Sequence, residues 1–354
     1  MNQTKNKNIY SKLPKTFFVL APMDDVTDVV FRQIVAECAL PDLFFTEFVN
    51  VDGLQSVGRP RLLPKLRLGS SEDRVIAQLW GKNPENYFKT VSEIVSGKLV
   101  VEANQINSQS VKSVLQESDE QGKALHNFIG VDINMGCPDK TVVKNGCCSA
   151  LINNRQLAKD IITACQQASK DPFPISVKTR VGFTTVDLSW IEFLLSLKLN
   201  ALTIHLRTAK EMSKVPAHWE LMEQIVQMRD SISPTTKIIG NGDITSYEQG
   251  VKYTEKFGLD GIMIGRGIFN DPYVFAKNSQ WQNLGKQERI KLYKKQIELF
   301  AKTWQNQERR VPTLNKFCKI YIQNFEGAKE LREKLMKANT TYNLIEILNQ
   351  ELLN

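Results

Sequence analysis

The sequence lacks any long uninterrupted apolar run, because charged residues recur along the whole chain. A helix that spans a membrane needs about 20 consecutive apolar residues, so we expect no membrane segment. Residues 1–15 are polar and basic and hold no apolar stretch, which argues against a secretory signal. These absences predict a cytoplasmic protein without a membrane partner.

Cysteine and histidine are scarce, with six cysteines and three histidines in 354 residues. No two cysteines have Cys-x-x-Cys spacing, and the histidines do not complete a zinc-binding pattern, so we expect no metal site. The cysteines are scattered through a long chain without a secretory signal. This distribution predicts reduced thiols and no disulfide framework.

The composition is that of a folded protein, with 42% hydrophobic and 24% charged residues. A chain of this length suits one large domain plus a smaller one, and a (β/α)₈ barrel is compatible with the size of the large domain. The net charge of +8 is uneven. Residues 277–354 hold 15 Lys and Arg against 8 Asp and Glu, which leaves 31 minus 30, or +1, for residues 1–276. A basic segment can bind a polyanion such as nucleic acid, and it can equally be a solvated helical surface.

Eight short runs rich in β-branched and aromatic residues alternate with helix-length stretches. The runs are 16–23, 43–49, 74–81, 130–136, 174–180, 201–208, 237–244 and 261–267. The helical stretches between them are 26–38, 84–96, 156–169, 186–197, 218–228 and 246–257. This alternation predicts a TIM (β/α)₈ barrel, with an open, doubly wound sheet as the alternative.

The alternation stops after Asp271-Pro272, where helical spacing continues without strands. The helical segments are 287–304, 313–324, 328–337 and 342–353. We therefore divide the chain into a barrel domain, residues 1–276, and a small all-α domain, residues 277–354. Residues 97–129 are polar and weakly periodic, which indicates an insertion into the barrel.

Glycines and one arginine follow the seventh and eighth runs, where many barrels bind phosphate. Gly242, Gly265 and Gly267 would let backbone N–H groups approach a phosphate, and Arg266 could pair with it. Glycines also end strands for conformational reasons alone. Together with the other sites, however, the pattern favours a phosphorylated cofactor.

Polar residues interrupt several of the apolar runs near their carboxyl ends. Lys178 would need a carboxylate or an electron-rich ligand beside it, and a flavin satisfies that need because a nearby cation stabilises the reduced ring. Gln78 could hydrogen-bond a pyrimidine-like edge, and His205 could reach a cofactor or a substrate. Each of these two could equally be a satisfied polar residue at a strand end.

Cys137 stands between glycine and proline, which predicts a thiol on a tight loop instead of a packed helix. A free thiol has an ordinary pKa of about 8.5, so it can deliver a proton near neutral pH. Cys137 is therefore the candidate general acid. Burial in the core, the usual fate of free cysteine, suits Cys38 and Cys165 better.

These motifs, in this order, resemble those of the tRNA-dihydrouridine synthases over residues 17 to about 348. They are APM at 21–23, TEF at 46–48, AQLWG at 77–81, DINMGCPDK at 132–140, VKTRVG at 177–182, IHLRT at 204–208, NGDI at 241–244 and MIGRG at 263–267. KIYIQNFEGAKELREKLM at 319–336 is similar to the family's helical RNA-binding domain.

The resemblance implies an FMN-dependent enzyme that uses NADPH to reduce the C5=C6 bond of uridines in tRNA. Hydride would pass from FMN to C6, and Cys137 would protonate C5. The implied FMN-binding residues are Pro22, Met23, Asp24, Gln78, Lys178, His205, Asn241, Gly242, Asp243, Gly265 and Arg266. The implied substrate-binding residues are Asn134, Arg207, Lys319, Lys329 and Arg332. Nothing in the sequence requires more than a monomer.

Two other functions remain compatible with parts of the sequence. An FMN barrel enzyme that reduces a free pyrimidine, like dihydroorotate dehydrogenase, would share the lysine, the phosphate loops and a loop cysteine. A noncatalytic RNA-binding protein on a decayed barrel would share the basic helices. The basic C-terminal segment argues against the first, and bound flavin would exclude the second.

Overall fold

The computed structural model describes residues 8–105, 127–169, 172–305 and 308–353. Residues 106–126, which belong to the predicted insertion, lie outside the described residues. Within the described ranges, no helix has both the length and the apolar character required to cross a membrane.

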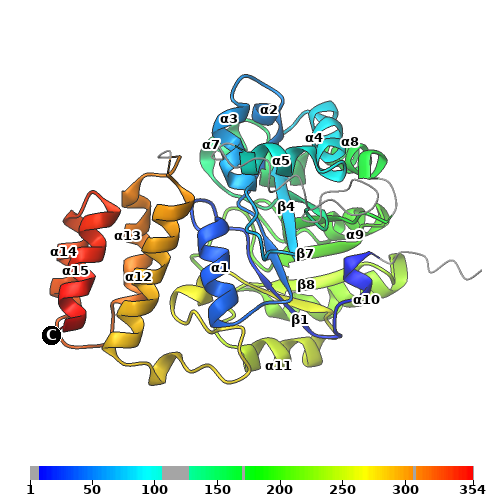
Figure 1. Cartoon of the computed structure of the whole chain (residues 1–354). Coiled ribbons are helices and arrows are strands. Elements are labelled where there is room, and N and C mark those ends of the chain that lie inside the picture. Colours follow the sequence, from blue (N-terminus) through cyan, green and yellow to red (C-terminus); the bar gives the residue numbers. More distant parts are fainter. Residues whose placement is uncertain (1–7, 106–126, 170–171, 306–307, 354) are drawn as a thin grey trace, which may run out of the picture.

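A closed barrel of parallel strands forms the larger part of the molecule (Figure 1). Its strands are β1 (Phe17–Leu20), β2 (Leu43–Phe45), β4 (Val75–Trp80), β5 (Val131–Met135), β6 (Ile175–Arg180), β7 (Ala201–His205), β8 (Lys237–Asn241) and β9 (Gly261–Ile264). The two-residue strand β3 (Val49–Asn50) pairs only with the end of β4. Because β1 pairs with both β2 and β9, and β2 also pairs with β4, the ring closes. The prediction of a barrel is confirmed, and the open sheet is excluded.

Side chains on the strands alternate between the barrel interior and the surrounding helices. On β1, Phe17 and Val19 belong to the inner apolar cluster, whereas Phe18 and Leu20 belong to the outer one. All four are buried, because helices cover the outside of the ring and side chains fill its inside. The strands therefore appear in the sequence as nearly continuous apolar runs.

Six longer helices among the described residues connect the strands, and each overlaps one of the predicted helical stretches. They are α1 (Val29–Cys38), α4 (Pro84–Val95), α8 (Arg155–Ser169), α9 (Leu188–Ser196), α10 (Met222–Ile232) and α11 (Tyr247–Phe257). Side-chain caps fix several of their first turns. Asp28 accepts a hydrogen bond from the Phe31 N–H, and Ser246 accepts one from the Gln249 N–H.

The loops of the barrel contain further short α-helices that the sequence did not predict. They are α2 (Val51–Leu54), α3 (Arg59–Leu62), α5 (Lys98–Gln105) and α7 (Lys140–Lys144). The 3₁₀ helices are η1 (Ile9–Ser11), η2 (Leu63–Leu66), η3 (Cys148–Asn153), η4 (Trp219–Leu221) and η5 (Arg266–Phe269), with η6 (Trp281–Asn283) and η7 (Val311–Leu314) in the helical region after the barrel. Of these, η4 lies within the predicted stretch 218–228, and η7 overlaps the predicted stretch 313–324.

After Ile264, the described residues contain helices and no further strand. The long ones are α12 (Lys286–Thr303), α13 (Asn315–Tyr321), α14 (Ala328–Lys337) and α15 (Thr341–Leu353). Ile290, Tyr293 and Ile297 recur at helical spacing on α12 and are buried. This helical region lies against α1 of the barrel (Figure 1), where the rings of Phe31 and Phe317 are 4.9 Å apart.

Candidate active site

A cavity of about 590 Å³ opens at the carboxyl ends of the barrel strands. Residues that follow β1 and β9, and residues at the ends of β6, β7 and β8, line it. They are Ala21, Pro22, Met23, Lys178, Arg180, His205, Arg207, Ser213, Asn241, Gly242, Asp243, Ile244, Thr245, Met263, Gly265, Arg266, Gly267, Phe269 and Asn270. The volume lies within the range of about 300–1,000 Å³ that is usual for cofactor and ligand sites.

The cavity is strongly cationic. Lys178, Arg180, Arg207 and Arg266 line it, and Asp243 is the one carboxylate among the lining residues, so the formal balance is 4 minus 1, or +3. Burial, together with the positive charge of Arg180, lowers the pKa of Lys178 to about 8. Burial likewise lowers the pKa of Arg180 to about 10. These cations repel one another at short range, so an anion in the cavity would be stabilised.

His205 is a neutral imidazole in this environment. Burial, followed by the charges of Lys178, Arg180, Arg207 and Arg266, holds its pKa far below the usual range. Arg207 Nη1 lies 3.1 Å from His205 Nε2. A guanidinium only donates hydrogen bonds, so Nε2 accepts and the ring proton is on Nδ1. The histidine can therefore donate one hydrogen bond from Nδ1.

Two glycines allow the backbone of the loops after β8 and β9 to lie close to neighbouring residues, where a side chain would not fit. Gly242 has φ of +135°, and a Cβ there would lie 2.7 Å from the Cβ of Ala217. A Cβ on Gly267 would lie 2.4 Å from the carbonyl oxygen of Ile244. Side chains at either position would displace the loops. Arg266, which directly precedes Gly267 and is 60% exposed at its side chain, lies 3.4 Å from Asp243.

Cys137 follows β5 on a loop that the barrel interior holds by hydrogen bonds. Asn134 Oδ1 accepts from the Gly136 N–H at 3.1 Å and from the Cys137 N–H at 3.0 Å. The residue is half-buried, and burial raises the pKa of its thiol, whereas a hydrogen bond from the backbone of Asp139 lowers it. Cys137 does not line the cavity itself. Arg180 does, and its Nε donates to the neighbouring Gly136 carbonyl at 2.7 Å.

Most of the predicted cofactor residues line the cavity, but Asp24 and Gln78 do not. Gln78 is fully buried inside the barrel, where its Nε2 donates to Asp132 at 2.7 Å. Asp24 forms an ion pair with Lys65.

The predicted substrate residues occupy three places. Arg207 is at the cavity, where it pairs with Asp243, and Asn134 is beneath the Cys137 loop. Lys319 is exposed on α13, and Lys329 is exposed on α14. Arg332, also on α14, donates to the Ile322 carbonyl.

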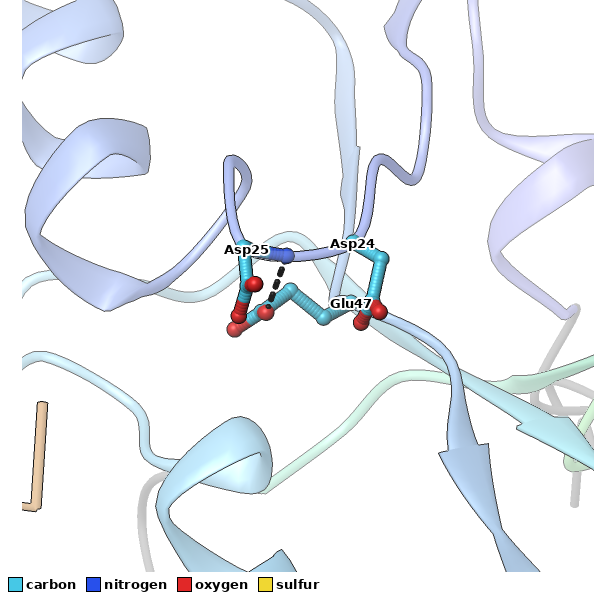
Figure 2. Close-up of side chains that lie close together, drawn as sticks. All are labelled: Asp24, Asp25 and Glu47. Carbon is cyan, nitrogen blue, oxygen red and sulfur yellow. Dashed lines mark hydrogen bonds between the residues drawn. The ribbon is translucent and has the colours of Figure 1, made fainter. Parts of the chain in front are cut away.

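Asp24, Asp25 and Glu47 form the one group among the described residues whose carboxylates lie close enough to share a metal ion (Figure 2). The chain supplies cations there itself. Arg309 forms an ion pair with the fully buried Glu47 and lies 3.7 Å from Asp25, while Lys65 pairs with Asp24. Figure 2 also shows the Asp25 N–H donating to Glu47 Oε1, at 2.7 Å. These contacts make the group an ion-pair network between the barrel and the segment before η7.

Two residues that shape the site had no role assigned from the sequence. Arg180 lines the cavity, and its signal was its place with Lys178 at the end of a strand run. Asp132 is fully buried, and burial raises the pKa of its carboxyl to about 7, while hydrogen bonds from Gln78 and Ser176 and the charge of Lys178 oppose this rise. Its signal was a carboxylate inside a fully buried strand.

A family model described as "Dihydrouridine synthase" matches residues 19–107 and 102–354. The "Probable tRNA-dihydrouridine synthase" of Staphylococcus aureus (strain COL) is 38% identical over 337 residues, which cover 94% of this chain and 92% of that protein. The "Probable tRNA-dihydrouridine synthase 2" of Bacillus subtilis (strain 168) is 39% identical over 338 residues, which cover 95% of this chain and 94% of that protein.

Among solved structures, histamine dehydrogenase from Rhizobium sp. 4-9 aligns at 12% identity with a TM-score of 0.48. The alignment covers 80% of this chain and about half, 48%, of that one.

Proposed function

Because this chain belongs to the dihydrouridine synthase family, we propose that it is a flavin-dependent tRNA-dihydrouridine synthase. The reaction is the reduction of the C5=C6 bond of uridines in tRNA to 5,6-dihydrouridine. One observation of the structure supports this proposal above the others. A cation-rich cavity at the mouth of the barrel adjoins, through Arg180, the loop that carries the Cys137 thiol.

The residues of the cavity fit FMN as the flavin. Gly242, Gly265 and Arg266 belong to the loops that would hold its phosphate, and Pro22, Met23 and Asp243, which line the same cavity, are further proposed FMN contacts. Lys178, His205 and Asn241 would face its ring. When bound, FMN supplies a hydride for C6 of the uracil ring after NADPH has reduced the flavin.

Lys178 is suited to stabilise negative charge on such a ring. Its Nζ donates to Asn241 Oδ1 at 3.2 Å, and it forms no ion pair with any carboxylate of the described residues. A cation that already has a carboxylate partner would contribute less to an added anion. The hydrogen bond to Asn241 holds the ammonium in the cavity, and the Asn241 amide is itself fixed by donating to the Met263 carbonyl at 2.8 Å.

Cys137 is the proposed general acid, which protonates C5 of the uracil. Its raised pKa keeps the thiol protonated at neutral pH, as a proton donor requires. Asn134 and Arg207 are the proposed contacts to the substrate base. Both are held in place before any substrate arrives, Asn134 by Gln78 and Arg207 by Asp243.

The helical region is the proposed tRNA-binding domain, residues 277–354, and residues 1–276 are the proposed catalytic domain. Lys319 and Lys329 offer exposed cations, and Arg332 lies one helical turn after Lys329. Contacts of this kind to phosphates orient an RNA without reading its bases. The target uridine must leave its stack to reach the barrel, which costs less in a loop than in a duplex. We further propose that the enzyme is a cytoplasmic monomer.

The test compares tRNA from cells with and without the gene. Digestion to nucleosides and mass spectrometry should show dihydrouridine at one or more positions in wild-type tRNA and its loss from the deletion strain. Expression of the gene in trans should restore it. Identical dihydrouridine in both strains would refute the proposal, as would a purified protein that cannot be reconstituted with FMN.

A further inference from the structure

Buried polar side chains gather at inward-facing positions of β4, β5 and β6. Gln78, Asp132, Asn134 and Ser176 lie on these three strands, and Asp132 faces neither the cavity nor solvent. The inner apolar cluster instead contains residues of β1, β2, β8 and β9, together with Ile76 of β4 and Ala201 of β7. A barrel interior is normally filled by branched apolar side chains, so this buried polar group calls for an explanation.

These residues form one hydrogen-bonded chain that ends at the loop of Cys137. Asp132 Oδ2 accepts from Gln78 Nε2 at 2.7 Å, and Gln78 Oε1 accepts from Asn134 Nδ2 at 3.1 Å. Asn134 Oδ1 then accepts from the backbone N–H groups of Gly136 and Cys137. Ser176 Oγ donates to the other oxygen of Asp132 at 2.7 Å.

The direction of this chain is fixed at the loop. Two backbone N–H groups there can only donate hydrogen bonds, so Asn134 presents its oxygen to them and its NH₂ group to Gln78. If the amide of Gln78 turned over, Asn134 would have to turn as well, and its NH₂ group would then face the N–H groups of Gly136 and Cys137. Gln78 and Asp132 are fully buried and Asn134 is 6% exposed, so water cannot repair the lost bonds.

We propose that Asp132 is a positioning residue, which acts through Gln78 and Asn134 to hold the Cys137 loop in one conformation. This role of Asp132 rests on the proposed function, in which Cys137 is the general acid, and adds a task for the loop that carries that residue. Asp132 touches neither the cavity nor the thiol. Its hydrogen bonds therefore act on the reaction indirectly, through the place of residues 136 and 137. Its charge also acts on Lys178 in the cavity, and Asp132→Asn separates the two effects because it removes the charge and keeps the hydrogen bond to Gln78.

The test measures the alkylation rate of Cys137 by iodoacetamide, followed by mass spectrometry of the peptide that contains it. Asp132→Ala removes the acceptor for Gln78, so the loop is released and the rate should rise by about fivefold, the equivalent of one lost hydrogen bond. Asp132→Asn keeps an acceptor for Gln78, and its amide can donate to Ser176, so it should restore the wild-type rate. Ser176→Ala is the matched control, because it leaves the Gln78 branch intact.

A second measurement follows dihydrouridine formation in tRNA by the same holoenzymes. Asp132→Ala should slow it by at least about tenfold, because small displacements of a reacting group are costly, and Asp132→Asn should restore it. If Asp132→Ala does not fold, Gln78→Met removes the next link and should also raise the alkylation rate.

Equal alkylation of Cys137 in wild type and Asp132→Ala would overturn the proposal. So would faster alkylation without a change in dihydrouridine formation. The alkylation measurement needs neither flavin nor tRNA, so its failure is distinguishable from failure of the proposed function.

Discussion

At the scale of single residues, the cavity holds its cations in a state that favours a bound anion. Lys178 has a pKa of about 8, and four surrounding cations keep His205 neutral. Each shift arises from burial first and from repulsion between like charges second. A phosphate or a negatively charged ring in the cavity would relieve that repulsion, which links the affinity for FMN to pH.

Lys178 should make FMN binding weaken as the pH rises. Below pH 8 the free enzyme carries the ammonium, and above pH 8 it loses the charge, so the affinity should fall by up to about tenfold between pH 7 and 9. Quenching of FMN fluorescence during titration measures this. Lys178→Met should bind more weakly at pH 7 and show a flatter pH profile. Lys237→Met, which removes a lysine paired with Asp260 away from the cavity, is the control. A pH profile shared by wild type and Lys178→Met would contradict the assignment.

Cys137→Ala should separate the reduction of flavin by NADPH from the reduction of uridine by flavin. Reduction of bound flavin by NADPH, followed at the flavin absorbance, should stay near the wild-type rate, because the thiol is needed only for the substrate. Dihydrouridine formation should fall by about 100-fold or more, the usual contribution of a general acid. Cys38→Ala, on α1, serves as the control and should be fully active. Full activity of Cys137→Ala would show that another group delivers the proton.

The sequence located the residues that line the cavity better than the buried polar residues that do not line it. Lys178, His205 and Arg266 could be predicted because they stand at strand ends, which converge in a barrel. Gln78 and Asp132 could not be placed, because the direction of a buried side chain depends on the register between strands. Asn134 pairs in register with Lys178 on the next strand, a relation that no local pattern contains.

At the scale of elements, the apolar runs predicted all the strands of the ring, because both faces of each strand are buried. The short helices α2, α3, α5 and α7 were missed. Gly53, Gly58 and Pro60 belong to or flank the first two, and such residues read as turns in a sequence. Their helical turns depend on tertiary contacts, such as the ion pairs of Arg59 with Glu93 and Glu102.

The loop after β9 should tolerate no side chain at Gly267. The Cβ of Gly267→Ala would lie 2.4 Å from the Ile244 carbonyl oxygen, so backbone must move and the wall of the cavity moves with it. We expect FMN binding to weaken by about tenfold, as for other overpacked sites. Gly58→Ala, whose Cβ would meet its nearest atom at 3.4 Å, is the control for a glycine far from the cavity. Isothermal titration with FMN measures both, and equal affinities would refute the role of this close approach.

At the scale of the whole molecule, an ion-pair network joins the helical region to the barrel. Arg309 pairs with Glu47 and lies 3.5 Å from Asp28. Nearby, Arg67 contacts Glu308 at 3.4 Å and its guanidinium lies 4.6 Å from the ring centre of Trp304. These contacts fix where the basic helices lie relative to the barrel mouth. No sequence pattern predicted them, since they join residues more than 200 positions apart.

Arg309→Met should destabilise the protein by about 3–5 kcal/mol, because it leaves the fully buried Glu47 without its partner. Burial already raises the pKa of Glu47, and Arg309 is the largest influence opposing that rise. In the variant, the buried Glu47 lowers the free energy of unfolding most when it is ionised. The destabilisation should therefore be greater at pH 8 than at pH 5. Urea denaturation at both values measures it. Arg310→Met, on the exposed neighbour, is the matched control, and similar losses in the two variants would contradict the role given to Arg309.

An assay of purified protein with FMN, NADPH and an unmodified tRNA transcript tests the proposed reaction most directly. Nucleosides from the treated transcript should contain dihydrouridine, which is two hydrogens heavier than uridine. This product should be absent when FMN or NADPH is omitted, and strongly reduced when Cys137 is replaced by alanine. The proposed reaction would be wrong if FMN-loaded protein oxidised NADPH but left the tRNA unchanged, or if it reduced a free pyrimidine instead.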